Sequence, residues 1–283
     1  MSKMQKLRRA ISSLFAALLL PTNSQASSDA PIPTDTDRWM VYDRLADDGR
    51  PLVVLVRTGN AEATALLQHG VATAINCRAD AANVNDQGMP QGTARLYSLE
   101  DRLDEAPALR SAHAIRVASV TGQGQRRMYF VHRNPVDFAS ILASSEVEGF
   151  LCSTSEVSDR QALIQLVTPT PLEIQLNGDQ EVIANLLKNG DDGLLPRKTD
   201  FWFYGEKAAL SNLATHLKPF GFSIDHWTTS PMGLVLTRDM PVDLASFRKT
   251  TPIIVDGTTR YDVTYDGWET LVISEASAPP TGN

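Results

Sequence analysis

The chain has 283 residues, a formal net charge of −7 at pH 7 and an apolar fraction of 42%. This length and apolar content suffice for one large domain or two modest ones with hydrophobic cores. The acidic balance argues against broad electrostatic affinity for nucleic-acid backbones or anionic lipids, so a partner attracted by charge should be basic. The two cysteines are too few for a disulfide-rich scaffold or a four-cysteine zinc site.

The first 26 residues have the order of a secretory signal peptide. Four basic residues within the first nine positions precede an apolar stretch over 10–20, and Ser24-Gln25-Ala26 supplies small residues for a cleavage site. The apolar stretch is about half of the roughly 20 residues that a membrane-spanning helix needs, so we expect no stable membrane anchor after cleavage. We predict cleavage after Ala26 and a periplasmic or secreted protein. The mature chain would keep 22 basic and 33 acidic residues, a net charge of −11.

A flexible lead-in and a hairpin are predicted next. Residues 27–37 carry two prolines among Ser, Thr and Asp, which is typical of an exposed segment. The first domain is expected over 38–165 and has no function that its sequence identifies. Its apolar segments 40–44 and 52–57 flank the turn-forming stretch 47–51, which predicts a β-hairpin.

The middle of the first domain gives a helix and a second hairpin. Leucines at three- and four-residue spacing, with acidic residues between them, predict a helix that ends near Pro107. The segments 115–120 and 127–132 enclose Gly122-Gln123-Gly124-Gln125, which is the clearest hairpin signal in the chain. A further helix is expected over 135–144.

Cys77 and Cys152 leave two alternatives open. In an oxidising compartment they can form one disulfide, provided that their Cα atoms come within about 7 Å of each other. Otherwise they are two separate buried cysteines that pack as small apolar residues.

A linker over 166–177, marked by two prolines, leads to a second domain over 178–273. The pattern of this domain predicts a helix, a short aromatic strand, a helix, two strands and a last strand. These elements are expected over 179–188, 201–204, 206–218, 222–228, 233–237 and 269–273. The polar tail over 274–283 contains two prolines and predicts disorder.

One segment of the second domain has no clear pattern. Residues 242–249 can start a helix, but Pro252, Gly257 and two adjacent threonines are poor helix interior. A strand over 253–255 that enters a turn is an equal alternative. The sequence therefore leaves the structure of 250–264 open.

The elements together predict an α+β fold of two domains with mainly antiparallel sheets. Strands and helices do not alternate regularly, as a doubly wound parallel sheet would require. The order of elements in the second domain is that of a ferredoxin-like α/β sandwich.

We expect no catalytic residues, no metal site and no cofactor. The chain lacks a His-Glu-x-x-His motif, a Gly-x-Ser-x-Gly elbow, a Walker loop and a Cys-x-x-Cys motif. Its five histidines do not have the spacing of two metal ligands on one element. The aspartate pairs at 47–48 and 191–192 directly precede glycine, where aspartate bonds its own backbone in a turn.

Aromatic residues crowd the second domain. Side chains alternate between the two faces of a strand, so two of the four aromatic residues over 201–204 cannot lie in the same core as the other two. Either a helix covers the second face, or an aromatic patch is exposed and binds a protein. The candidate partner-binding residues are Trp202, Tyr204, Trp227, Asp191, Asp192 and Trp268.

The second domain resembles a known family. Gly190-Asp191-Asp192-Gly193-Leu194, Asp200-Phe201-Trp202-Phe203-Tyr204 and Tyr265-Asp266-Gly267-Trp268-Glu269 are similar to segments of the regulator of ribonuclease E activity B (RraB) family. Residues 37–165 resemble an uncharacterised domain family that is often fused in front of RraB-like domains. The resemblance implies an acidic α+β protein without catalytic residues that binds another protein. In its founding members this protein inhibits ribonuclease E in the cytoplasm.

Three functional hypotheses follow. The preferred one is a non-catalytic exported protein that binds and modulates or inhibits a protein partner, such as a basic toxin or hydrolase. The second is a cytoplasmic regulator of ribonuclease E, which requires that the leader is not cleaved. The third is an enzyme that uses His216 and His226 with nearby acids, Asp200 or Asp225, which requires that these side chains converge.

Overall fold

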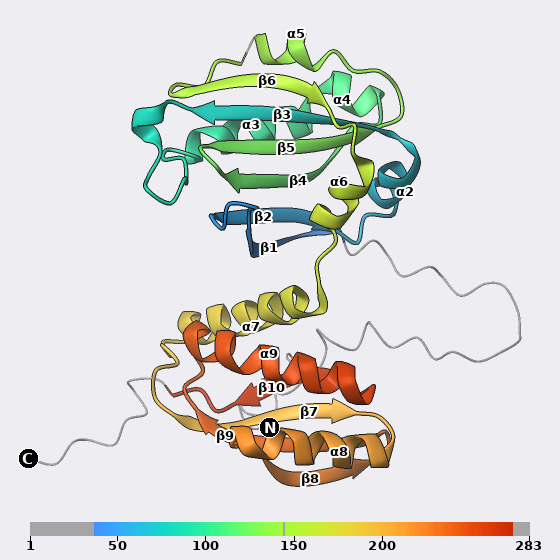
Figure 1. Cartoon of the computed structure of the whole chain (residues 1–283), viewed down its shortest axis with the longest axis vertical. Helices are drawn as coiled ribbons and strands as arrows, with labels where there is room; N and C mark the ends of the chain where they lie inside the picture. The colour runs from blue at the N-terminus through green and yellow to red at the C-terminus, as the bar shows by residue number, and fades with distance from the viewer. Residues whose placement is uncertain (1–36, 144, 274–283) are drawn as a thin grey trace, which may run out of the picture. The chain divides into compact units, whose positions relative to one another are not determined.

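The structure of the chain, a computed structural model, describes residues 37–143 and 145–273 (Figure 1). The described residues divide between Glu173 and Ile174 into two compact units, and each unit is described by itself. The predicted signal peptide, residues 27–36 of the lead-in and the tail over 274–283 lie outside the described residues. In the described part of the chain, no helix is long and apolar enough to cross a membrane.

The N-terminal unit is built on one sheet of six strands in the order β1-β2-β4-β5-β3-β6, with every neighbouring pair antiparallel (Figure 1). The strands are β1 Arg38–Leu45, β2 Pro51–Thr58, β3 Val71–Ala79, β4 Ile115–Gly122, β5 Gln125–His132 and β6 Phe150–Glu156. The helices are α2 Ala61–His69, α3 Ala94–Glu105, α4 Pro107–Ser111, α5 Phe138–Ala143 and α6 Arg160–Val167, with a short 3-10 helix η1 Ala81–Asn83. Both predicted hairpins are confirmed as β1-β2 and β4-β5.

The central strands of this sheet are apolar on both faces because different helices cover the two sides. On β5, Tyr129 and Val131 join one core cluster, to which α2 and α6 contribute. Met128 and Phe130, which point to the other face, join a second cluster with side chains of α3, α4 and α5. Successive side chains of β5 therefore pack alternately into the two core clusters on either side of the sheet.

A disulfide joins β3 to the edge strand β6. Cys77 and Cys152 are directly opposite in the ladder, with Cα atoms 4.0 Å apart and a sulfur–sulfur distance of 1.97 Å. Cys77 is fully buried, and Cys152 packs beside it against the second cluster. Of the two alternatives left open by the sequence, the structure has the bonded pair.

The segment over 166–177, expected to be a linker, is mostly helical. α6 ends at Val167, and α7 Pro171–Lys188 begins four residues later. Proline fits the first turn of a helix because the backbone N–H that it lacks has no partner there. Pro171 therefore starts a helix in the segment for which the two prolines predict a linker.

The C-terminal unit is an antiparallel sheet of four strands in the order β10-β7-β9-β8, with α8 and α9 on one face. The elements after α7 are β7 Arg197–Tyr204, α8 Lys207–Leu217, the 3-10 helix η2 Lys218–Phe220, β8 Ser223–Thr229, β9 Met232–Met240, α9 Leu244–Tyr261 and β10 Thr264–Thr270. Strand, helix, strand, strand, helix and strand in this order form the ferredoxin-like arrangement. The predicted α+β class with antiparallel sheets is confirmed for both units.

Most of the segment 250–264, which the sequence left open, belongs to the helix α9, which runs through Pro252 and ends at Tyr261. Asp243 caps its N-terminus by accepting a hydrogen bond from the backbone N–H of Ser246 at 2.8 Å. Its inner face buries Phe247 and Ile254 completely. Burial of this face outweighs the poor helix propensity of the segment, because most helical stability in proteins comes from packing.

Candidate functional site in the C-terminal unit

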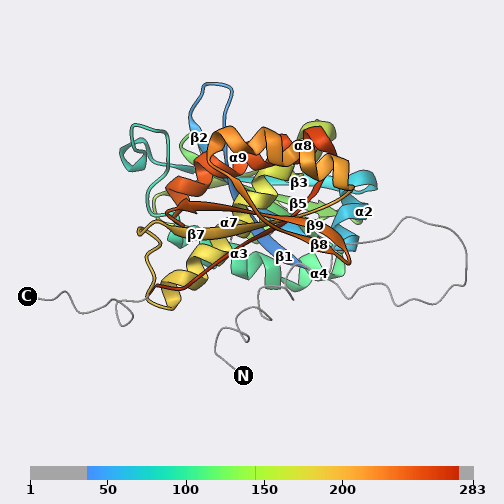
Figure 2. The ribbon, with the colours of Figure 1, turned by 90° about the horizontal axis from the view of Figure 1, so that it is seen from below.

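The strand β7 carries the aromatic residues of this unit on two faces. Phe201 and Phe203 are fully buried against the helices, whereas Trp202 and Tyr204 point to the opposite face and are half-buried. Figure 2 shows α8 and α9 side by side along the same side of this sheet. We call the opposite side, on which Trp202 and Tyr204 lie, the open face.

Neighbouring strands are shaped around these two rings. Gly233 on β9 lies opposite Tyr204, and a Cβ atom at this position would come within 2.8 Å of the Tyr204 ring. Gly267 on β10 lies opposite Trp202 and adjoins a β-bulge. Gly233 therefore leaves space for the Tyr204 ring, as expected where a ring approaches a backbone closely, and Gly267 adds no side chain beside Trp202.

Charged side chains occupy the far part of the open face. Lys198 on β7 donates to Asp225 on β8 at 2.8 Å and lies 3.3 Å from Asp200. The imidazole Nδ1 of His226 is 2.8 Å from the other oxygen of Asp225, and the His226 ring meets Trp202 edge-on with centroids 5.8 Å apart. Hydrogen bonds to Lys198 and His226 lower the pKa of Asp225, and the bond to Asp225 raises the pKa of Lys198.

A cavity of about 100 Å³ opens where α7 passes the bulged edge strand β10. Its lining contains Trp202, Tyr204 and three carboxylates, and none of the described residues that line it is lysine, arginine or histidine. The lining residues are Gln175, Gly178, Asp179, Val182, Trp202, Tyr204, Asp266, Gly267, Trp268 and Glu269. The cavity thus joins an aromatic wall to an acidic one.

Asp179 is the buried carboxylate of this cavity, with 3% of its surface exposed. The hydroxyl of Thr251 donates to one oxygen at 2.6 Å, and the indole Nε1 of Trp268 donates to the other at 2.8 Å. Burial raises the pKa of Asp179 to about 6, although both hydrogen bonds oppose this shift. Burial also raises the pKa of Asp266 at the bulge.

Residues 177–270 match the family model of RraB, the regulator of ribonuclease activity B. The C-terminal unit is an RraB domain. The family is one of regulators, and its description names a ribonuclease as what is regulated. This RraB domain therefore belongs to a regulatory, partner-binding class.

The other comparisons add nothing on function. No curated protein matches the chain. The crystal structure of an unknown protein from Galdieria sulphuraria is similar at 12% identity, with 71% of this chain and 99% of that chain covered and a TM-score of 0.20. A likeness at this level does not define a fold.

The structure separates the six candidate partner-binding residues. Only Trp202 and Tyr204 lie on the open face of the RraB domain. Trp227 is paired with the buried Leu234, so it points to the opposite face, where Lys207 lies 6.0 Å from its ring. Trp268 is 4% exposed and stacks on Phe247 in the core with centroids 4.3 Å apart.

The two aspartates of the Gly-Asp-Asp-Gly motif have different environments. Asp191 is buried and accepts from the guanidinium of Arg197 and from the backbone N–H of Ile273. Burial raises the pKa of Asp191, but these hydrogen bonds and the positive charge outweigh it and leave the pKa below its usual range. Asp192 is exposed and accepts from the backbone N–H of Leu194 at 3.0 Å. The motif therefore forms the loop before β7, and the buried Asp191 holds this loop to Arg197 and Ile273.

Sequence reasoning missed Asp179, Asp266 and Glu269 as part of a site. One signal was present for Asp179, since it lies on the same helical stripe as Ile183 and Leu186, which are buried. A carboxylate on an apolar stripe needs a partner within the fold. Asp266 and Glu269 belong to a segment that resembles the RraB family, but nothing in their spacing reveals the cavity.

The histidines of the third hypothesis do not converge. His216 on α8 lies among Phe220, Tyr261 and Asp256, on the face of the sheet that the helices cover. His226 contacts Trp202 on the open face. Within residues 37–143 and 145–273, no group of three His, Cys, Asp or Glu side chains could hold a metal ion.

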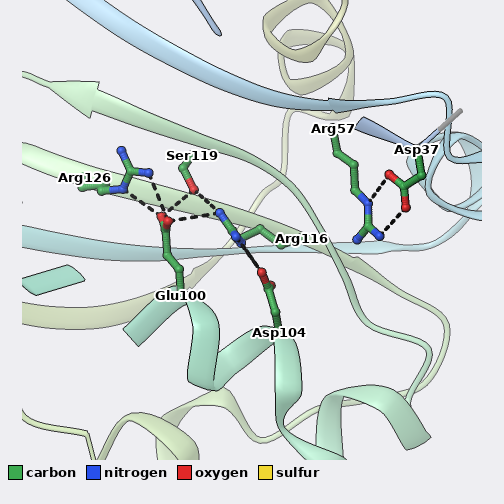
Figure 3. Close-up of polar contacts among 7 residues, drawn as sticks. All are labelled: Asp37, Arg57, Glu100, Asp104, Arg116, Ser119 and Arg126. Carbon is green, nitrogen blue, oxygen red and sulfur yellow. Dashed lines mark hydrogen bonds and ion pairs between the residues drawn. The ribbon is translucent and has the colours of Figure 1, made fainter. Parts of the chain in front are cut away.

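The N-terminal unit holds a buried network of charges between α3 and the sheet (Figure 3). Glu100 on α3 accepts from Arg126 on β5 at 2.8 and 3.1 Å and from Ser119 on β4 at 2.7 Å. Arg116 on β4 lies 3.2 Å from Glu100 and donates to Asp104 at 2.6 Å. In Figure 3, Arg57 and Asp37 form a separate pair. The network fixes α3 to β4 and β5 by compensating each buried charge.

Proposed function

We propose that this chain is an exported, non-catalytic regulator that binds a protein partner through its RraB domain and inhibits it. The observation that carries the proposal is the open face, where a sheet of a partner-binding domain presents Trp202 and Tyr204 beside acidic side chains. Tryptophan and tyrosine dominate binding hot spots in protein interfaces. The excess of acidic residues favours a basic partner, because complementary charge speeds association.

Two features support export. The order of charges, apolar residues and small residues over 1–26 is that of a cleaved leader. The Cys77–Cys152 disulfide is of the kind that persists in oxidising compartments. The mass of the intact protein from fractionated cells tests both: we expect a periplasmic or secreted chain without its first 26 residues and 2 Da lighter than its reduced form. A cytoplasmic chain that keeps its leader would contradict export.

Partner binding is tested by crosslinking from the two sides of the RraB domain. A photo-reactive residue in place of the exposed His226 on the open face should capture a partner in cells. The same residue in place of the exposed Ser211 on α8 is the matched control on the helical side and should capture none. The captured protein, once identified and purified, should lose activity when the chain is added. Capture that is equal from both positions would contradict an interface on the open face.

The second candidate function is regulation of ribonuclease E in the cytoplasm. The family match favours it, because the family is described as a regulator of ribonuclease activity. It requires an uncleaved leader, so the mass measurement that tests export also separates the two candidates. Under this alternative the photo-reactive residue at 226 should capture ribonuclease E.

A further inference from the structure

We propose that the cavity between α7 and β10 receives an arginine side chain of the partner protein. The inference rests on the proposed partner binding and identifies the contact at its centre. It follows from the aromatic and charged residues that line the cavity and from a comparison of the buried carboxylates among the described residues.

The cavity has the walls that a guanidinium group prefers. Trp202 and Tyr204 contribute aromatic side chains, whose faces attract cations within about 6 Å of the ring centre. Asp266 and Glu269 on β10 contribute carboxylates, which bind guanidinium through paired hydrogen bonds. Arginine fits this combination better than lysine, because its planar group stacks on rings and is more weakly hydrated.

The comparison of buried carboxylates points the same way. Three acidic residues are buried among the described residues: Glu100, Asp179 and Asp191. Glu100 pairs with Arg116 and Arg126, and Asp191 pairs with Arg197. Among residues 37–143 and 145–273, the side chain of Asp179 accepts hydrogen bonds from the neutral donors Thr251 and Trp268 and has no ion pair.

A buried carboxylate usually has a cationic partner, because burial of an unpaired charge is costly. At Asp179 the chain supplies none among the residues that line the cavity. A cationic side chain of a partner that enters the cavity would pair with Asp179, as arginines of this chain pair with Glu100 and Asp191. Glycine at 178 and 267 adds no side chain to the lining and leaves room for this entry.

The nearest lysine on β7 does not fill this role. Lys198 lies at the other end of the strand from Tyr204 and is engaged with Asp225 and Asp200. Lys198 therefore offsets part of the negative charge in its half of the open face. The lining of the cavity contains three carboxylates and no lysine, arginine or histidine, so the cavity is the part of the open face that lacks a cation.

The test uses the full oxidised protein and two small probes of equal shape. N-acetyl-arginine methylamide carries the guanidinium, and N-acetyl-citrulline methylamide replaces it with a neutral urea. Nuclear magnetic resonance spectra of the tryptophan indole N–H groups report binding. We expect the arginine probe to shift the Trp202 and Trp268 signals in a saturable way, with an affinity at least tenfold higher than that of the citrulline probe. Equal affinity, or no shift of either signal, would overturn the assignment.

Variants locate the site. Glu269→Gln and Asp266→Asn should each lower the affinity of the protein for the arginine probe about threefold or more. Asp239→Asn is the matched control, because Asp239 is an exposed carboxylate on β9 that does not line the cavity. The affinity of Asp239→Asn for the arginine probe should stay within twofold of that of the parent protein. A loss of affinity equal to that of the cavity variants would overturn the assignment. Glu269→Gln decides the matter if Asp266→Asn does not fold.

The outcome is distinguishable from failure of the proposed function. If crosslinking from position 226 captures a partner but the arginine probe does not bind, only the cavity assignment fails. If the probe binds as expected but no partner is captured, the proposed function fails and the cavity remains a guanidinium site.

Discussion

Asp179 and Trp268 are joined by a hydrogen bond of 2.8 Å from the indole Nε1 to the carboxylate, within the core of the RraB domain. The contact connects α7 to the edge strand β10, which lie 89 residues apart in sequence. Trp268 also stacks on Phe247 of α9, so one indole links three elements. The carboxylate that holds it is ionisable, and this makes the stability of the domain depend on pH.

Replacement of Asp179 by asparagine should abolish part of this pH dependence. The pKa of Asp179 is raised from 3.8 to about 6 in the folded protein, so the folded state binds more protons than the unfolded state between these values. The contribution of Asp179 to stability is therefore greatest below pH 4 and falls as pH rises to 6, by about 3 kcal/mol in the free energy of unfolding. Relative to the parent, Asp179→Asn should gain most of this amount, about 2 kcal/mol, between pH 4 and pH 7 in urea titrations.

Thr251→Val provides a second arm of this experiment. The hydroxyl of Thr251 favours the ionised carboxylate, so its loss should move the pH dependence to higher pH. If the difference between parent and Asp179→Asn is constant from pH 4 to pH 7, the raised pKa is wrong.

The two glycines of the Gly-Asp-Asp-Gly motif should differ in their tolerance of alanine. Both have positive φ, +78° at Gly190 and +73° at Gly193. A Cβ atom at 190 would meet nothing within 4 Å, whereas at 193 it would lie 2.8 Å from the carbonyl oxygen of Val242. We expect Gly190→Ala to cost about 1 kcal/mol from its left-handed backbone alone. Gly193→Ala should cost about 3 kcal/mol, because the neighbouring backbone must also move. Equal losses in urea unfolding would show that Val242 does not constrain position 193.

Removal of the charge at Glu100 should destabilise the N-terminal unit strongly. Glu100→Gln leaves Arg116 and Arg126 buried with less compensation, which we expect to cost about 3 kcal/mol. Glu105→Gln removes an exposed carboxylate from the end of the same helix and should change stability by less than about 0.5 kcal/mol. Unfolding of the two variants in urea, followed by tryptophan fluorescence, compares them. Similar losses would mean that the network adds nothing beyond surface charge.

The two hairpins of the N-terminal unit and the alternation of side chains along β7 could be predicted from the sequence, because they depend on the order of neighbouring residues. Gln123 and Gly124 both adopt positive φ between β4 and β5, which is the turn that the glycine pattern indicates. Alternation along β7 likewise separates Phe201 and Phe203 from Trp202 and Tyr204. These features depend on residues that are close in the chain.

The helix α9 and the cavity could not be predicted from the sequence, because they depend on contacts between residues far apart in the chain. α9 is helical through Pro252 because Phe247 and Ile254 are buried by distant elements, which local propensity does not report. The cavity depends on the passage of α7 beside the bulge at Asp266, a contact between segments far apart in sequence. Likewise, the position of Trp227 on the face opposite Trp202 depends on the register of β8 with β9.

The disulfide should contribute a large share of the stability of the N-terminal unit. It links residues 75 positions apart, and the loss of chain entropy in the unfolded state for such a loop corresponds to about 4 kcal/mol. A reductant should therefore lower the melting temperature of the parent protein. The double variant Cys77→Ala/Cys152→Ala should melt at a similarly lowered temperature and should not respond to the reductant.

Because Cys77 and Cys152 pack in the core cluster beside Phe130, the variant also loses a little buried volume, so its melting temperature should lie slightly below that of the reduced parent. A parent protein whose melting temperature is the same with and without reductant would contradict a stabilising disulfide.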